Sequence, residues 1–415
     1  MSIYSPPKAY SFYDDDLAIT KEGLQLRRKG IKYLRENGLC VVILAGGQGT
    51  RLGSDLPKGC YKLPMFNISL FEIHCEVLKE AQRLFETEIK LIIMTSSHTH
   101  DHTVKFFKNN EFFGMKRENI YFYQQTSEVC VDIEGKKLPF YKKFATAPNG
   151  NGSVFKMFSQ YRLFDSVLKN IKYCSIISVD NVLAKAVDPI SIALLESNGW
   201  DVCNKSVTKN ENENVGVFIN KNGSLMVKEY SELQTMCKSQ DDSKKKNVLT
   251  DVSNINQENS LRNIKSPNRS QESINQQIDT ETDEEKIPLE DLDKYVEGNI
   301  CNHLFRVSFL KTLKDVDLPI HKAFKKIPYT DKNNNLIEPK EPNGYKSELF
   351  IFDCLEFTKK AGLINVPRCF EFAPVKNAPN TGVDDPETAV IALKRKEMLT
   401  KYDGISTENV EYGFY

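Results

Sequence analysis

Three glycines and two basic side chains lie close together in the first part of the chain, and they are suited to bind phosphate. They follow an apolar run, Val41 to Ala45, which predicts a buried parallel strand because polar residues do not alternate along it. Glycines at the end of a strand let backbone N–H groups approach an anion, and nearby cations neutralise its charge. The residues are Gly46, Gly47, Gly49, Arg51 and Lys58.

Two common kinds of glycine loop do not fit this spacing. A Walker loop ends in Gly-Lys-Ser/Thr, whereas Gly49 is followed by Thr50 and Arg51. A dinucleotide fingerprint needs Gly-x-Gly-x-x-Gly, whereas the next glycine after Gly47 and Gly49 is Gly53, one residue too late. An ordinary turn between a strand and a helix has no need of two cations. We therefore expect a phosphate-binding loop of another class.

The segment from Leu44 to Gly53 reads Leu-Ala-Gly-Gly-Gln-Gly-Thr-Arg-Leu-Gly, and Pro-Lys-Gly follows at 57–59. It resembles the signature of the UDP-N-acetylhexosamine pyrophosphorylases, nucleotidyltransferases that join UTP and N-acetylglucosamine 1-phosphate. The resemblance implies that Leu44, Ala45 and the glycines hold the nucleotide. It also implies that the two basic residues stabilise the departing pyrophosphate.

Two later segments resemble the nucleoside-binding motifs of the same family. Gln125 ends a predicted strand that begins at Ile120, and it matches a glutamine that reads the uracil edge. An amide suits this role because it can donate and accept hydrogen bonds at once. The loop 147–153 resembles the family's Pro-Asp-Gly-Asn-Gly-Gly loop, which holds uridine and reaches the sugar. The matched residues in this loop are Gly150, Asn151 and Gly152.

A carboxylate follows a further buried strand, which is predicted over Cys174 to Val179. Asp180 lies at the carboxyl end of this strand, where ligands bind in open parallel sheets. Its segment resembles the family's Val-Asp-Asn-Ile/Val-Leu motif, whose aspartate holds Mg²⁺ against the phosphates. The resemblance therefore implies Mg²⁺ (or Mn²⁺) with Asp180 as its protein ligand, since Mg²⁺ needs few carboxylates when phosphates and waters complete its shell. The alternative role of Asp180 is that of a helix cap.

Sugar contacts are implied for the second half of the chain. A predicted hairpin, 214–232, carries Gly216 and Glu229, which match residues near the N-acetyl group and the sugar hydroxyls. A carboxylate that accepts hydrogen bonds without titrating suits sugar recognition. The segment Gly-Asn-Ile-Cys-Asn-His supplies Asn299 and Asn302 as further contacts to the amino sugar.

Two lysines and three histidines complete the candidate chemistry. Lys346 matches the family lysine that steers the attacking phosphate, and Lys376 is a second candidate. His303 could be a general base, but a phosphate acceptor with a second pKa of about 6 needs none, so we expect a structural role. His98 and His102 have helical spacing for a metal pair, but their polar surroundings favour a helix start.

The hydrophobic pattern predicts an α/β fold. Ser69 and Glu72 form a capping-box pattern ahead of an amphipathic helix, and Lys90 to Thr95 makes the next strand. Strand, helix, strand in this order builds a parallel sheet. With the resemblance, we expect a doubly wound, mostly parallel sheet of the nucleotide-diphospho-sugar transferase type, with small N- and C-terminal satellites.

Four parts of the chain are distinguished. Residues 1–38 are expected to form an N-terminal helical segment, 39–372 the catalytic domain, and 373–415 a short C-terminal segment. Within the domain, about 235–291 has no aromatic residue and is dominated by polar side chains. Such a stretch buries too little apolar surface to offset the entropy of ordering, so we predict a disordered insertion.

Composition restricts the class of protein further. The 415 residues are 40% hydrophobic with a formal net charge of zero, so global charge favours neither nucleic acid nor an anionic membrane. The ten cysteines form no Cys-x-x-Cys pair, and neither a secretion signal nor a bilayer-spanning run occurs. We expect a cytoplasmic protein with reduced thiols that is a monomer or weak dimer.

The reaction that these motifs imply is UTP plus N-acetylglucosamine 1-phosphate giving UDP-N-acetylglucosamine and pyrophosphate. The sugar phosphate would attack the α-phosphorus in line with the leaving pyrophosphate, without a covalent intermediate. Two alternatives stay open. One is a pyrophosphorylase that also takes N-acetylgalactosamine or glucose 1-phosphate, and the other is a non-catalytic sensor of UDP-sugars.

Overall fold

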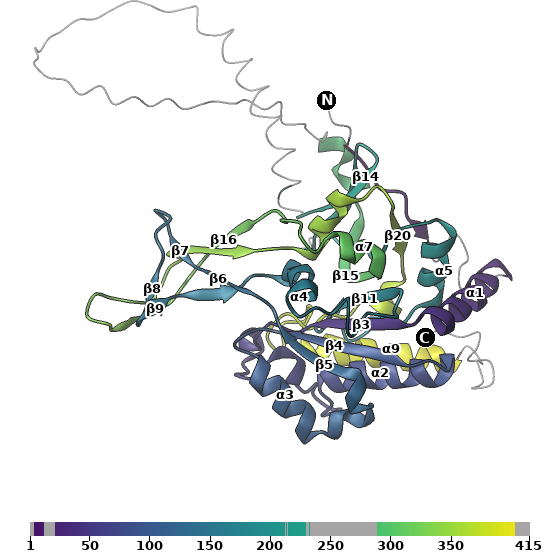
Figure 1. The fold of residues 1–415 in the computed structure, drawn as a ribbon, viewed down its shortest axis with the longest axis horizontal. Coiled ribbons are helices and arrows are strands. Elements are labelled where there is room, and N and C mark those ends of the chain that lie inside the picture. Colours follow the sequence, from purple (N-terminus) through teal and green to yellow (C-terminus); the bar gives the residue numbers. More distant parts are fainter. Residues whose placement is uncertain are drawn as a thin grey trace, which may run out of the picture.

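A large mixed sheet forms the centre of the protein (Figure 1). The structure, a computed structural model, describes residues 4–11, 21–211, 213, 215–229, 232 and 289–402. The sheet's eleven strands are β1 (Tyr4–Ser5), β2 (Tyr10–Ser11), β3 (Leu39–Leu44), β4 (Ile89–Thr95), β5 (Ile120–Gln124), β11 (Tyr173–Ser178), β12 (Val202–Thr208), β13 (Val217–Lys221), β14 (Ser224–Lys228), β15 (Glu297–Arg306) and β20 (Ala361–Asn365).

The strand order is β2-β20-β12-β15-β11-β3-β4-β5, with β13, β14 and β1 attached beside β15. The strands from β11 to β5 are parallel to one another, as are those from β2 to β12. Only β15 of this path runs antiparallel to its neighbours, β11 and β12. The predicted mostly parallel α/β sheet is therefore confirmed, with one reversed strand in its middle.

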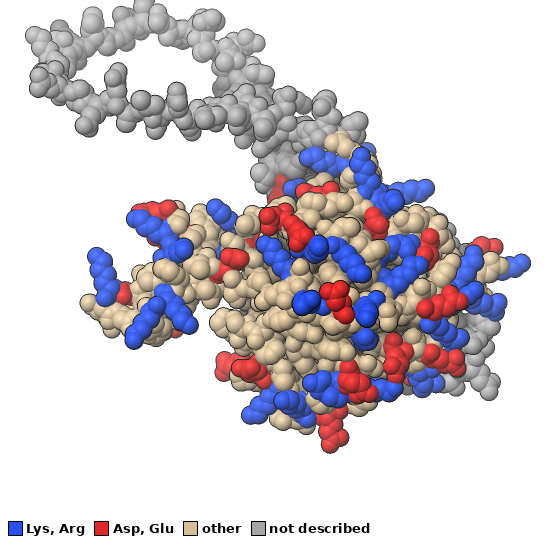
Figure 2. All heavy atoms as spheres, in the orientation of Figure 1, with Lys and Arg blue, Asp and Glu red and all other residues tan. Residues whose placement is uncertain are grey.

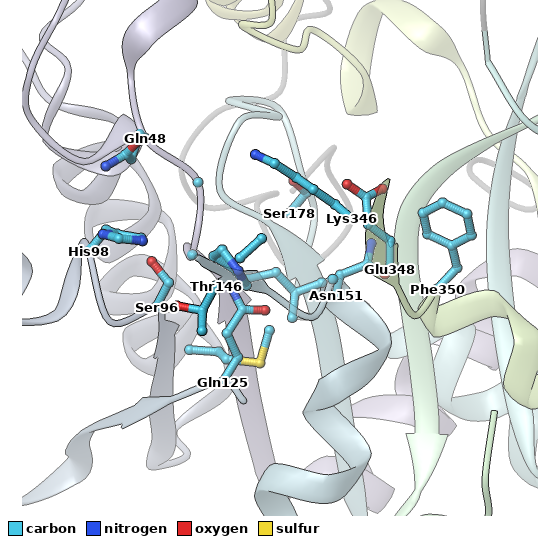
Figure 3. Close-up of a pocket in the computed structure, with 17 residues that line it drawn as sticks. Gln48, Ser96, His98, Gln125, Thr146, Asn151, Ser178, Lys346, Glu348 and Phe350 are labelled. Atoms are coloured by element: carbon cyan, nitrogen blue, oxygen red, sulfur yellow. The ribbon is translucent and has the colours of Figure 1, made fainter. Parts of the chain in front are cut away.

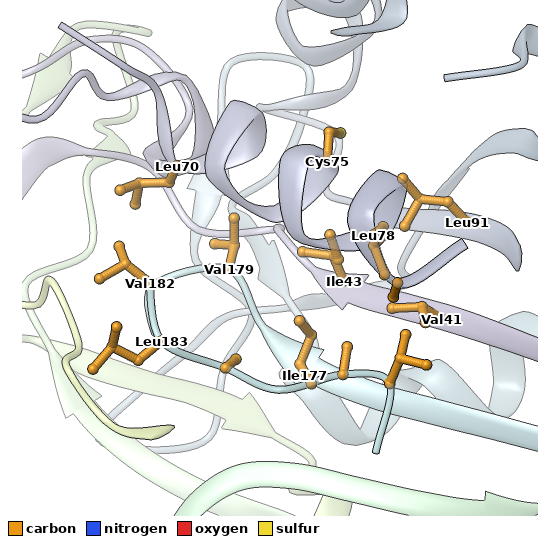
Figure 4. Packing of buried hydrophobic residues seen from close by; sticks show 14 of the residues in the cluster. Val41, Ile43, Leu70, Cys75, Leu78, Leu91, Ile177, Val179, Val182 and Leu183 are labelled. Atoms are coloured by element: carbon orange, nitrogen blue, oxygen red, sulfur yellow. The ribbon is translucent and has the colours of Figure 1, made fainter. Parts of the chain in front are cut away.

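Alternate side chains of the central strands enter two separate cores. Val41 and Ile43 of β3 pack in the larger cluster with helix α2, as Figure 4 shows, whereas Cys40 and Val42 face the other layer. All four are fully buried. This double burial is the reason why β3 lacks polar alternation in the sequence.

Helices cover both faces of the sheet. They are α1 (Lys21–Asn37), α2 (Leu70–Phe85), α3 (His100–Asn109), α4 (Val154–Gln160), α5 (Pro189–Ser197), α7 (Val307–Thr312), α8 (Arg368–Glu371) and α9 (Pro386–Tyr402). The 3-10 helices are Thr50–Leu52, Lys58–Cys60, Glu111–Gly114, Arg117–Asn119, Asn151–Ser153, Leu289–Lys294 and Ile351–Phe357. The predicted capping box of α2 is confirmed, because the Ser69 hydroxyl accepts from Glu72 N (3.1 Å) and the Glu72 carboxylate accepts from Ser69 N (3.3 Å).

Short strands project from one end of the main sheet as an arm, at the left of Figure 1. They are β6 (Ser127–Val129), β7 (Val131–Asp132), β8 (Pro139–Phe140), β9 (Lys143–Phe144), β10 (Thr146–Pro148), β16 (His321–Lys325), β17 (Tyr329–Thr330), β18 (Leu336–Ile337) and β19 (Gly344–Glu348). The arm has a small core of its own, which includes Cys130, Leu138 and Ile327. On the face in Figure 2, Lys and Arg side chains are interspersed with Asp and Glu.

Three expectations about elements were wrong. The apolar spacing from Val154 to Ile171 predicts one amphipathic helix, but α4 ends at Gln160, and Arg162 shortly beyond has a positive φ (52°). The apolar run from Leu349 to Phe357 predicts a further α-helix, but the structure has a 3-10 helix that starts at Ile351. The N-terminal segment contributes strands β1 and β2 to the sheet as well as helix α1.

The predicted domain boundaries remain predictions. The insertion at about 235–291 lies outside the described residues, apart from its last three positions. Helix α9, from the predicted C-terminal segment, packs in the same core as α2 through Ala389 and Val390. No helix of the described residues is long and apolar enough to cross a membrane.

Candidate active site

The carboxyl ends of β3, β4, β5 and β11 surround a cavity of about 480 Å³ (Figure 3). Seven of its lining residues were predicted from the sequence: Leu44, Gly46, Gly47, Gln125, Gly150, Asn151 and Lys346. This volume lies within the range of about 300–1,000 Å³ that is usual for small-molecule sites. The cavity also lies where ligands bind in open parallel sheets.

The glycine loop after β3 folds back on itself. Gly49 N donates to Leu56 O (3.1 Å), and a Cβ at Gly49 would lie only 2.8 Å from that oxygen. A larger residue at this position would therefore disturb the hydrogen bond that closes the loop. Lys58 N then donates to Gly47 O (3.1 Å). The fold of the loop thereby brings Lys58 next to the glycines that precede it.

Gln125 is held in a fixed orientation at the floor of the cavity. Its side-chain oxygen accepts a hydrogen bond from the Ser153 hydroxyl (3.2 Å), and its amide nitrogen lies against Gly46, where a Cβ would overlap it. The residue is only 8% exposed. Gly46 and Ser153 thus contact this amide from two distant segments, and the Ser153 hydroxyl also lies 2.7 Å from Gly150 O in the second glycine loop.

The second glycine loop is tied to the start of the 3-10 helix at Ile351. Gly152 N donates to Leu349 O (2.9 Å), and Asn151 Oδ1 accepts from Ile351 N (2.8 Å). Gly150 has φ 80° and ψ 173°, a conformation that only glycine adopts without strain. A Cβ at Gly150 would also overlap the carbonyl oxygen of Leu349.

We therefore expect Gly150→Ala to destabilise the protein by about 2–6 kcal/mol, the sum of backbone strain of about 1–3 and overpacking of about 1–3 kcal/mol. Urea unfolding measures this free energy. Gly135→Ala is the matched control, because Gly135 has nearly the same φ (81°) but no atom within 4 Å of an added Cβ. Gly135→Ala should lower the free energy of unfolding only by the backbone strain of about 1–3 kcal/mol. Equal losses in both variants would contradict the close approach of Leu349.

Lys58 and Asp180 meet at the edge of the cavity. Lys58 Nζ lies 3.4 Å from Asp180 Oδ2, and the side chains are 19% and 18% exposed. Ser178, which lines the cavity, donates to Asp180 Oδ1 (2.6 Å). Burial alone would raise the pKa of Asp180, but Lys58, Ser178 and Lys376 outweigh it and hold this pKa below its ordinary value. The carboxylate is therefore ionised at neutral pH.

Lys376 belongs to the same neighbourhood. Val375 N donates to Asp180 O (2.9 Å), which places the residue after it beside the end of β11. Lys376 Nζ forms an ion pair with Asp384 (3.7 Å). Two lysines from distant segments thus flank one carboxylate, which is an arrangement suited to a bound phosphate group.

Three of the predicted sugar residues, Gly216, Glu229 and Asn299, lie next to one another, close enough to Lys376 for its charge to act on Glu229. Gly216 O accepts from Asn299 N (2.8 Å), and a Cβ at Gly216 would lie 3.3 Å from Glu229 Oε1. Burial, together with Glu232, raises the pKa of Glu229 above its ordinary value. Asn302 is 3% exposed and donates to the Lys185 carbonyl (3.2 Å), so its amide is already used within the protein.

The two remaining predicted cations lie in different settings. Lys346, on β19 of the arm, lines the cavity, as does Ser178 (Figure 3). Arg51 is exposed on the 3-10 helix Thr50–Leu52 and does not line the cavity. Of the four predicted phosphate-binding cations, Lys346 lines the cavity, Lys58 and Lys376 lie beside Asp180 at its edge, and Arg51 is placed by neither contact.

Several cavity residues were not predicted as site residues. Gln48, Ser96 and His98 form one wall, and Glu348 and Phe350 form another (Figure 3). His98 was weighed as a metal ligand with His102 and then assigned to a polar helix start. Its position just after β4, at the carboxyl edge of the sheet, could have indicated a site residue.

His303 has the expected structural setting. It is 1% exposed, its Nδ1 lies 2.7 Å from Asn204 Oδ1, and burial lowers its pKa to about 4. It does not line the cavity described above.

A parallel α/β sheet with a glycine loop, an oriented amide and a lysine–aspartate pair at one edge has the architecture of a nucleotidyltransferase. The family model described as "UTP--glucose-1-phosphate uridylyltransferase" matches residues 7–291, and the chain belongs to this family. The sequence-based assignment to the pyrophosphorylases is thereby confirmed.

Individual relatives agree over most of the chain. An Encephalitozoon cuniculi protein named "Probable UDP-N-acetylglucosamine pyrophosphorylase" is 39% identical over 91% of this chain and 95% of its own. A crystal structure from Entamoeba histolytica matches with a TM-score of 0.75 at 27% identity, over 97% and 90% of the two chains. The Trypanosoma brucei uridine diphosphate N-acetylglucosamine pyrophosphorylase matches with 0.72 at 25% identity, over 99% and 77%.

Proposed function

We propose that the protein is a UDP-N-acetylglucosamine diphosphorylase, which converts UTP and N-acetylglucosamine 1-phosphate to UDP-N-acetylglucosamine and pyrophosphate. The observation that carries this proposal is the Lys58–Asp180 pair at 3.4 Å beside the glycine loop, in a chain whose relatives bear that name. In this reaction, an oxygen of the sugar phosphate forms a bond to the α-phosphorus of UTP. The bond from that phosphorus to the α–β bridging oxygen of UTP breaks, and this oxygen leaves as a terminal oxygen of pyrophosphate.

Each group of the site has a separate role in this reaction. Gly46, Gly47 and Gly49 approach the nucleotide with their backbone, and Gln125 hydrogen-bonds the uracil edge. Lys58 and Arg51 neutralise the departing pyrophosphate, while Lys346 and Lys376 hold the attacking phosphate. No general base is required, because the attacking phosphate is already largely ionised at neutral pH. Catalysis then consists of positioning and charge stabilisation.

The residues present suit a divalent cation that is completed by substrate oxygens. No group of three or more His, Cys, Asp or Glu side chains in the described part of the chain could hold a metal ion by itself. Asp180 is ionised, partly exposed and beside the cavity, and it would hold Mg²⁺ or Mn²⁺ together with phosphates and waters. Such an ion would neutralise charge on the phosphates.

A pyrophosphate-release assay tests the proposal. UTP should be used in strong preference to CTP, ATP and GTP, and N-acetylglucosamine 1-phosphate is the expected acceptor. Comparison with N-acetylgalactosamine and glucose 1-phosphate measures the sugar range. Binding of UDP-sugar without any pyrophosphate release at saturating Mg²⁺ would instead establish the sensor function.

Gln125→Ala tests the role in uracil recognition. We expect its kcat/KM for UTP to fall about tenfold or more, because truncation leaves a polar edge of the base without a partner in a buried site. Its preference for UTP over CTP should fall with it. Gln124→Ala is the matched control, since Gln124 ends β5 one residue earlier and does not line the cavity. An unchanged preference in Gln125→Ala would remove this residue from base recognition.

A further inference from the structure

Strand β15 departs from regular geometry where it passes the end of β11. Asn204 of β12 pairs with His303, but the next pair in this ladder joins Ser206 to Asn299. One residue of β12 therefore lies opposite three residues of β15, and β15 bulges away from its neighbour. On its other edge, β15 stays paired with β11 only as far as Asn302. Bulges are frequent next to active sites, where they redirect side chains.

Cys301, in the middle of this bulge, has a left-handed backbone conformation (φ 52°). Residues with a Cβ atom rarely adopt such an angle, whereas glycine adopts it freely and asparagine more readily than most. The N–H group of Cys301 donates to the side-chain oxygen of Asn299 (3.0 Å), and Asn299 N donates in turn to Gly216 O (2.8 Å). The strained residue is thus bonded directly to the amide of a predicted sugar ligand.

The contact with Cys301 determines which end of the Asn299 amide is free. A backbone N–H group can only donate, so the side-chain atom that faces it must be the oxygen Oδ1. The nitrogen Nδ2, with its two donors, has no hydrogen-bond partner among the described residues, and the Asn299 side chain is partly exposed. The bulge therefore leaves two donors available to a ligand, and sugar oxygens can accept from them.

The sulfur of Cys301 is not suited to chemistry at neutral pH. Burial raises the pKa of this thiol to about 12, and the charges of Asp180 and Lys376 are close enough to act on it as well. A protonated thiol is a poor nucleophile and a poor metal ligand. The backbone conformation of Cys301, and not its sulfur, therefore distinguishes this residue. It also lies between the predicted sugar residues and the carboxylate that follows β11.

We propose that Cys301 is a positioning residue for the amino sugar, because its left-handed conformation turns the Asn299 amide so that Nδ2 donates to the sugar. The inference rests on the proposed function, since it places the sugar of UDP-N-acetylglucosamine beside Asn299 and Gly216. It adds a residue that acts through Asn299 and needs no contact of its own with the substrate. A side chain that disfavours a positive φ should therefore weaken sugar binding and leave nucleotide binding unchanged.

Isothermal titration calorimetry of the full chain with UDP-N-acetylglucosamine and with UDP tests this inference. Cys301→Val should weaken binding of the sugar nucleotide about fivefold or more, as expected for one lost hydrogen bond, and leave the Kd for UDP unchanged. Cys301→Asn is the matched variant, because asparagine is about as large as valine but tolerates a positive φ far better. It should bind both ligands like the wild type. Glu86→Val, at an exposed position with a similar φ (47°), controls for backbone strain elsewhere in the fold.

A double-mutant cycle separates an action through Asn299 from a direct one. Asn299→Ala should weaken binding of UDP-N-acetylglucosamine relative to UDP, and Cys301→Val should have no further effect in that background. Asn299→Asp keeps an acceptor for Cys301 N but removes both donors. It should lose as much affinity for the sugar as Asn299→Ala, yet unfold at a higher urea concentration. This variant keeps the bulge, so it tests the inference even where Cys301→Val does not fold.

Three results would overturn the inference: wild-type binding of the sugar nucleotide by Cys301→Val, equal losses in Cys301→Val and Cys301→Asn, or an additional loss from Cys301→Val in the Asn299→Ala background. Unchanged sugar affinity in Asn299→Asp would overturn it as well. Calorimetry does not depend on turnover. A wild type that binds both ligands without releasing pyrophosphate would therefore contradict the proposed reaction and leave these comparisons valid, whereas a wild type that binds neither ligand would overturn both proposals.

Discussion

Lys58→Ala is expected to lower kcat/KM for pyrophosphate release by about 10²–10³-fold, the usual effect of removing one group that stabilises transition-state charge. The side chain is 19% exposed and paired with Asp180 at 3.4 Å, so its charge acts where water screens it poorly. Asp180 keeps the hydrogen bond from Ser178 in this variant. We therefore expect the protein to remain folded, and steady-state kinetics with UTP give the measurement.

Lys62→Ala is the matched control for this experiment, because Lys62 lies four residues further on and is exposed. It should retain wild-type activity. Arg51→Ala should lose activity by orders of magnitude if the loop brings Arg51 to the phosphates when UTP binds. Near-normal turnover in both Lys58→Ala and Arg51→Ala, with wild-type unfolding curves, would rule out the proposed mechanism.

Local sequence patterns predicted the parts of the site that single segments determine. The run ahead of Gly46 predicted a doubly buried strand because both of its faces are apolar, and the capping box at Ser69 predicted the start of α2. The same reasoning placed Asp180 at a strand end. In each case the determining interactions lie within a few residues of one another, so the sequence contains them.

Contacts between distant segments were not predictable in this way. Ser153 contacts Gln125, and Asp180 pairs with Lys58 from another loop. No local sequence pattern indicates which distant side chain a residue such as Ser153 or Lys58 will contact. The reversed direction of β15 depends on which strands it pairs with, and a two-residue strand such as β2 has too few residues for any periodicity to appear.

Asp180→Asn is expected to abolish most activity by a different route from Lys58→Ala. The amide keeps the shape of the side chain but removes the negative charge that a divalent cation requires. We expect kcat to fall about 10²–10³-fold and the Mg²⁺ concentration for half-maximal rate to rise. Titration of Mg²⁺ at saturating UTP separates the two effects.

Asp384→Asn provides the matched control, since Asp384 pairs with Lys376 near the same site but does not end a strand at the cavity. Its Mg²⁺ requirement should equal that of the wild type. Lys58→Ala should not raise the Mg²⁺ concentration for half-maximal rate, because removal of the cation beside Asp180 leaves this carboxylate free for a divalent ion. If Asp180→Asn kept the wild-type Mg²⁺ curve, Asp180 would have only a structural role, and the metal would have to be held by the substrates alone.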